Sequence, residues 1–127
     1  MSLALSFLSR NKPRISRVRL RRMKDAILGK RYSLSVVFTR AACVRQLNRE
    51  YRKKDRPTEI LSFPLSKSEG EILIAPAVAR REARKFGRPF ENFLLFLLIH
   101  GLLHLKGMQH GSRMERQESK FRKKFGI

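Results

Sequence analysis

The three histidines of this chain fall within eleven residues, His100-Gly-Leu-Leu-His104-Leu-Lys-Gly107-Met-Gln-His110. His100 and His104 are four residues apart, so on a helix their rings share one face. If the helix continued, His110 would lie about 9 Å beyond His104 along the axis and away from that face. Gly107 lies between them, and glycine readily takes the left-handed conformation that ends a helix. We therefore expect the chain to turn back at Gly107 and to bring the three imidazoles together.

Three neutral imidazoles with a fourth position left for water form the ligand set of a catalytic zinc ion. The alternative is that these are ordinary core or surface histidines. Two imidazoles on an apolar helix need polar partners, because burying them alone carries a desolvation cost. One metal ion supplies a partner for both. The pattern therefore favours one Zn²⁺ per chain, bound by His100, His104 and His110.

The spacing H-x3-H-x2-G-x2-H is also that of the metzincin proteases, whose motif is H-E-x-x-H-x-x-G-x-x-H. The glutamate that acts as general base in such zinc proteases is replaced here by Gly101. Peptide hydrolysis therefore has no obvious base. The excess of positive charge points instead to a phosphodiester substrate.

A second segment, residues 47–64, reads LNREYRKKDRPTEILSFP. Together with Gly70-Glu71-Ile72 and the histidine block, it resembles the YbeY family of bacterial endoribonucleases, which cut single-stranded RNA and act in ribosomal RNA maturation. The three blocks follow one another in the family's order over residues 32–120, with Gln109 where the family usually has Asp. The resemblance implies an α+β fold and a metal-dependent nuclease.

The resemblance also implies roles for individual residues. His100, His104 and His110 would hold the zinc ion, and Arg52 would be the catalytic arginine near the metal. Residues 70–72 would form the edge strand of the sheet beside the cleft. The substrate would be ribosomal RNA, at the 3′ end of the 16S molecule, and the partner the small ribosomal subunit. The residues themselves name no clear general base: Glu59 and Glu71 are candidates, and each could equally be an ordinary surface carboxylate.

Three functions therefore remain to be compared. The first is a zinc-dependent endoribonuclease, the second an RNA- or ribosome-binding protein with a structural zinc and weak catalysis, and the third a zinc protease. The missing glutamate at Gly101 argues against the third. Structural zinc usually has four protein ligands, and only three are found here, which favours catalysis over a structural metal.

The length of 127 residues suits one domain with a real core. The single cysteine, Cys43, excludes a disulfide framework and any zinc site built from cysteine pairs. The longest apolar run, residues 93–105, spans 13 residues and is too short to cross a bilayer. We expect a cytoplasmic, monomeric protein with no membrane association.

The pattern along the chain predicts a single α+β domain, a small mixed sheet packed with about five helices around a central apolar helix. That helix is the one ending near Leu105, because it is apolar on every side. The expected order is βαβαββααα, with an edge strand at residues 2–8, an antiparallel hairpin, and Pro89 as the first residue of the central helix. The expected ranges are 2–8, 14–28, 32–39, 40–51, 58–65, 70–75, 76–86, 89–105 and 113–125.

Charge is concentrated near both ends of the domain. Thirty Lys and Arg face ten Asp and Glu, for a formal net charge of +20. Residues 10–31 carry ten basic residues against one acid, and residues 113–124 carry six against two. A basic N-terminal segment and a basic C-terminal helix of this kind suit the backbone of an RNA, in contacts that are independent of sequence and sensitive to salt.

Overall fold

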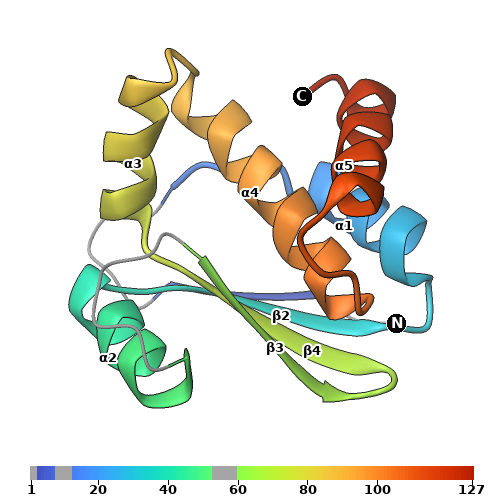
Figure 1. Ribbon diagram of the computed structural model, residues 1–127, viewed down its shortest axis with the longest axis horizontal. Coiled ribbons are helices and arrows are strands. Elements are labelled where there is room, and N and C mark those ends of the chain that lie inside the picture. Colours follow the sequence, from blue (N-terminus) through green and yellow to red (C-terminus); the bar gives the residue numbers. More distant parts are fainter. Residues whose placement is uncertain (1–2, 8–12, 53–59) are drawn as a thin grey trace.

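The computed structural model in Figure 1 describes residues 3–7, 13–52 and 60–127. The described residues form one α+β domain, as predicted, with a four-stranded mixed sheet and five helices. In chain order these are β1 (Leu3–Phe7), α1 (Arg17–Leu28), β2 (Ser33–Phe38), α2 (Ala41–Arg52), β3 (Ile60–Ser66), β4 (Glu69–Ile74), α3 (Pro76–Lys85), α4 (Phe90–Leu105) and α5 (Ser112–Phe125).

The sheet has the order β1-β2-β4-β3. β1 and β2 pair in parallel, as do β2 and β4, whereas β3 and β4 form the predicted antiparallel hairpin. The expectation that residues 70–72 form an edge strand is therefore wrong. The hairpin places β3 on one side of β4, and the crossover through α2 leaves β2 paired along the whole of the other side. β3 and β1 are the two edges.

Helix α4 is the centre of the molecule, as its all-round apolar sequence predicts. Ten of its sixteen residues are buried. It crosses one face of the sheet over β3 and β4, while α1, α3 and α5 pack around its remaining sides (Figure 1). Burial of each large apolar side chain contributes about 1.5–3 kcal/mol. The helix that carries two of the histidines is therefore fixed by the core on the faces that do not carry them.

Helix α2 lies on the opposite face of the sheet from α4 (Figure 1). It packs there through a second, smaller cluster made of Val44, Leu61, Ala75 and Val78. Arg52, for which the resemblance implies a catalytic role, is the last residue of α2. None of the helices in the described ranges has the length and apolar character needed to span a bilayer.

Two predicted boundaries differ from the structure in instructive ways. Helix α1 begins at Arg17, because the hydroxyl of Ser16 accepts a hydrogen bond from the Arg19 backbone N–H at 3.2 Å and caps the helix there. Pro89 is the N-cap of α4 and not its first residue, since its ψ of 144° is extended. Residues 2 and 8 of the predicted edge strand and residues 58–59 at the start of the predicted hairpin lie outside the described residues.

Candidate metal centre

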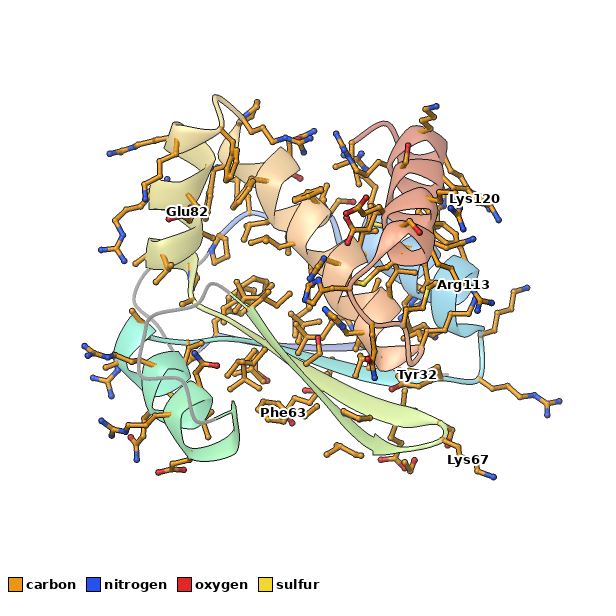
Figure 2. All side chains as sticks on the ribbon, viewed as in Figure 1. Tyr32, Phe63, Lys67, Glu82, Arg113 and Lys120 are labelled. Carbon is orange, nitrogen blue, oxygen red and sulfur yellow. The ribbon has the colours of Figure 1, made fainter. Side chains whose placement is uncertain are left out.

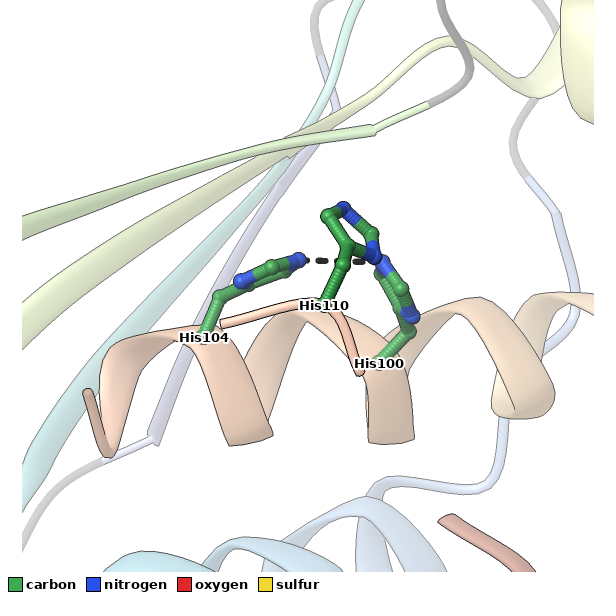
Figure 3. Close-up of side chains that lie close together, drawn as sticks. All are labelled: His100, His104 and His110. Carbon is green, nitrogen blue, oxygen red and sulfur yellow. Dashed lines mark hydrogen bonds between the residues drawn. The ribbon is translucent and has the colours of Figure 1, made fainter. Parts of the chain in front are cut away.

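His100 and His104 lie one turn apart on α4 and point to the same side of it (Figure 3). Their ring centroids are 4.6 Å apart, and their Nε2 atoms are 3.0 Å apart. Both side chains are partly buried. Because α4 is fixed by the core on its other faces, the two rings are presented by a rigid element.

The chain turns back immediately after α4. The N–H of Gly107 donates to the His104 carbonyl at 2.9 Å, and the N–H of Met108 donates to the Leu103 carbonyl at 3.0 Å. This pair of bonds is a Schellman motif, which needs a left-handed residue at the position of Gly107, where φ is +100°. The turn returns His110 to the other two rings, with centroid distances of 5.1 Å to His100 and 4.8 Å to His104. The three imidazoles meet as the sequence predicts.

Hydrogen bonds at Nδ1 determine which nitrogen each ring presents. The Nδ1 of His104 lies 3.0 Å from the backbone carbonyl of Met108, and the Nδ1 of His100 lies 2.5 Å from a carboxylate oxygen of Glu118. A carbonyl oxygen and an ionised carboxylate can only accept, so each Nδ1 carries the proton. Both rings therefore present the lone pair of Nε2 to the centre of the cluster.

Two lone pairs that face each other at 3.0 Å repel unless a proton, as in the hydrogen bond drawn in Figure 3, or a metal ion lies between them. Tetrahedral zinc with Zn–N bonds of about 2.0–2.1 Å would place neighbouring ligand nitrogens about 3.3 Å apart. One ring nitrogen from each of the three histidines lies within 4.8 Å of the others. The cluster could therefore hold a metal ion, and a small shift of the rings would suit zinc.

Glu118 is the functional residue that sequence reasoning missed. It comes from α5 and is 17% exposed, so its contact with His100 is partly shielded from water. A signal was present in the sequence: Glu118 lies on the same face of α5 as Met114 and Phe121, both of which are buried. A carboxylate on the apolar face of a helix needs a partner, and here the partner is His100 of the histidine cluster.

Gly101 shows why the protease alternative fails at this position. A Cβ atom on Gly101 would lie 2.9 Å from Ile60 Cδ1, 3.0 Å from Ser62 Oγ and 3.1 Å from Ile72 Cδ1. The position that carries the base in metzincins is therefore packed against β3 and β4, with no room for a glutamate side chain. A hydrogen bond strengthens this packing, because the Ser62 hydroxyl of β3 donates to the Gly101 carbonyl at 3.1 Å.

Of the other candidate residues, only Glu71 can be placed relative to this centre. Ile72 faces α4, and side chains alternate along a strand, so its neighbour Glu71 points to the opposite face of the sheet from the histidines. Glu71 is therefore not a general base for this centre. Glu59 lies outside the described residues. Arg52 ends α2, and its side chain also lies outside what the structure describes.

Known proteins resemble this chain over nearly its whole length. The family described as Endoribonuclease YbeY matches residues 9–125. The Endoribonuclease YbeY of Geobacter metallireducens is 37% identical over an alignment covering 100% of this chain and 95% of that protein. The Endoribonuclease YbeY of Aquifex aeolicus is 41% identical, over 70% of this chain and 63% of the relative.

A solved structure supports the same relationship. The solution structure of TM1509 from Thermotoga maritima superimposes with a TM-score of 0.63 at 27% identity, covering 97% of this chain and 88% of the other. Sequence blocks, fold and the convergent histidines thus agree with the family match. This chain belongs to the YbeY endoribonuclease family.

Proposed function

We propose that this protein is a zinc-dependent endoribonuclease that cuts single-stranded RNA. The observation that carries the proposal is the cluster of three imidazoles, in which one ring nitrogen of each lies within 4.8 Å of the others and the Nε2 atoms of His100 and His104 face each other. Three protein ligands leave a coordination position open, which is the arrangement of catalytic rather than structural zinc. The family membership and the net charge of +20 favour RNA as the substrate.

Each part of the site has a role in this proposal. His100, His104 and His110 hold the ion, while Glu118 and the Met108 carbonyl keep the first two rings in the tautomer that binds metal. When bound, zinc would lower the pKa of its water to about 7 and polarise a phosphoryl oxygen. Arg52 would hold the phosphate through two parallel N–H donors and stabilise the charge that develops on it.

The metal requirement is tested by elemental analysis of the purified protein and by cleavage of a single-stranded RNA with and without chelator. We expect about one zinc per chain, and cleavage that the chelator stops and added zinc restores. His104→Ala should lose both zinc and cleavage. Full zinc content in His104→Ala would overturn the three-histidine site.

The same experiment separates the second candidate, an RNA-binding protein with a structural zinc. The three-ligand cluster speaks against it, because structural sites are closed by a fourth protein ligand. Stoichiometric zinc and tight RNA binding with no cleavage at any enzyme concentration would favour this candidate over the nuclease.

Arg52 is tested against Arg49, which belongs to the same basic run on α2. Arg52→Ala should keep zinc and fold but slow single-turnover cleavage by about 10²–10³, the effect of losing one donor to a developing oxyanion. Arg52→Lys should rescue only partly, because one ammonium cannot reproduce the planar pair of donors. Arg49→Ala should change cleavage little. Equal, small losses in the two alanine variants would make Arg52 an ordinary surface charge.

We further propose that the protein acts in the cytoplasm, as a monomer, on ribosomal RNA of the small subunit during maturation of the 16S 3′ end. The basic segments at residues 10–31 and 113–124 support an RNA-rich partner, because several clustered cations are needed to follow a phosphate backbone. Cells that rely on His104→Ala should accumulate 16S RNA with an unprocessed 3′ end, read by end mapping. Normal ends in those cells would contradict this role.

A further inference from the structure

A second feature of interest lies next to the three histidines in the chain, where the turn that follows α4 meets α5. A cavity of about 580 Å³ opens between this turn and α5. The turn contributes Lys106 and Gln109, and α5 contributes Arg113, Gln117 and Lys120. Figure 2 shows Arg113 and Lys120 along the same side of α5, where the helical repeat also places Gln117. The volume falls within the range of small-molecule sites.

The walls of this cavity carry positive charge without compensation. Three of the side chains are cations, two are amides, and none is a carboxylate. Within the described ranges, Lys106, Arg113 and Lys120 form no ion pair with Asp or Glu. Glu118, the neighbour of Gln117, is held by His100 instead. Like charges that converge on a concave surface attract an anion more strongly than the same charges spread over a flat one.

The cavity and the metal centre share one short stretch of chain. Gln109 directly precedes His110, and the carbonyl of Met108, whose residue also lines the cavity, fixes His104. An extended polyanion lying across the histidines can therefore reach the cavity with a neighbouring unit. A single-stranded nucleic acid has this form, with one phosphate per nucleotide.

We infer that this cavity binds a backbone phosphate of the RNA strand, next to the phosphate at the metal centre. The inference rests on the proposed function, because it takes its ligand from the same substrate. Lys106, Arg113 and Lys120 supply the charge, and the amide N–H groups of Gln109 and Gln117 donate to phosphate oxygens. Such contacts position the strand without reading its sequence.

Removal of the charge is the first test. The variant Lys106→Ala/Arg113→Ala/Lys120→Ala is compared with Lys67→Ala/Arg81→Ala/Arg84→Ala, which removes three exposed cations outside the cavity and outside the two basic segments. Affinity for a 2′-O-methyl oligonucleotide, checked to be intact after the measurement, is followed by anisotropy over a range of salt. The cavity variant should bind more weakly than the control and give a log–log salt slope shallower by about 0.7, the contribution of one phosphate on a single strand.

Addition of charge is the second test. Gln117→Glu places a carboxylate among the three cations, whereas Ser119→Glu places the same charge on the same helix away from the cavity. Gln117→Glu should weaken RNA binding more than Ser119→Glu, with unchanged zinc content in both. Zinc content is measured because a variant that loses metal would report on the metal centre.

The outcomes separate this inference from the proposed function. If the unaltered protein neither binds nor cuts RNA, the proposed function fails and the cavity loses its ligand. If the unaltered protein binds and cuts RNA, but the cavity variants match their controls in affinity and salt slope, the phosphate site is wrong and the nuclease remains.

Discussion

At the scale of single residues, the proposed metal centre depends on two oxygen atoms outside its ligand set. The carboxylate of Glu118 and the carbonyl of Met108 each hold one Nδ1–H, and the matching Nε2 atoms are thereby left as ligands. Such partners fix ring orientation and raise the basicity of the ligand. The carbonyl is part of the backbone, so only the Glu118 contact can be removed by substitution.

Glu118→Gln should weaken zinc binding by about 10–100-fold while the fold is kept, the usual effect of losing a partner of this kind. The amide is neutral and can turn its NH₂ group toward the ring, so it no longer selects one tautomer of His100. The dissociation constant is measured by competition with a chromophoric chelator, and ¹⁵N NMR of the His100 ring reports the tautomer directly.

The matched control is Glu115→Gln, which removes the same charge from an exposed position on the same helix. Its zinc affinity should stay close to that of the unaltered protein. Equal zinc affinities in the two variants would show that Glu118 only contributes net charge to the region.

The sequence predicts only the part of the site whose residues lie close together along the chain. His100, His104 and His110 could be found because one short stretch holds both their spacing and the glycine that turns the chain. Glu118 could not be assigned, because its contact with His100 depends on how α5 packs against α4. The cavity beside it has the same origin, since its walls come from two elements whose relative placement no local pattern encodes.

At the scale of elements, the connection between α1 and β2 is held by one buried lysine, Lys24. Lys24 is 2% exposed, and its ammonium group donates to the carbonyls of Gly29, Lys30 and Tyr32 at 3.3, 3.2 and 2.8 Å. It also forms an ion pair with Asp25 at 2.8 Å. One buried cation thus binds the carbonyl groups that connect α1 to β2, near the negative end of the helix dipole.

Lys24→Met should destabilise the protein by about 1–3 kcal/mol, because the buried carbonyl of Tyr32 and the two less buried ones lose their donor while the apolar stem is roughly preserved. Urea unfolding followed by circular dichroism measures the change. Lys30→Met removes the same charge from an exposed site in the same turn and should leave the midpoint nearly unchanged. Similar midpoints for the two variants would argue that the buried ammonium contributes little.

The elements themselves were largely predictable, because the periods of apolar residues are local. The alternation in β2 buries Leu34, Val36 and Phe38, and the continuous apolar sequence of α4 identified it as the central helix. The neighbours of β4 were not predictable in this way. A crossover connection decides whether β2 or solvent lies beside residues 70–72. The sequence of the strand itself does not distinguish the two cases.

At the scale of the whole molecule, the charge has opposite effects on folding and on binding. With +20 on 127 residues, the cations repel one another in the folded state. Added salt screens that repulsion, because the Debye length falls from about 30 Å at 0.01 M to about 10 Å at 0.1 M. The same salt weakens association with RNA, because each counterion released from the RNA gains less entropy when the surrounding salt concentration is higher.

We therefore expect the free energy of unfolding to rise with sodium chloride while the affinity for RNA falls. The RNA affinity should decrease linearly on a log–log plot, with a slope of about −0.7 for each phosphate contacted. Urea unfolding and anisotropy in the same buffers measure both. A flat RNA affinity across this range would rule out backbone contacts as the main source of binding.

The Glu118–His100 contact also sets an order of events during synthesis. Ribosomes build the chain from its N-terminus, so the three histidines emerge before residue 118 and before α5 can dock. Until then, His100 has no carboxylate to hold its Nδ1 proton, and the metal centre lacks one of its two orienting contacts. A nascent chain would thus carry every proposed ligand while its metal affinity stayed low. Docking of α5 against α4 would thus be the step that completes the site.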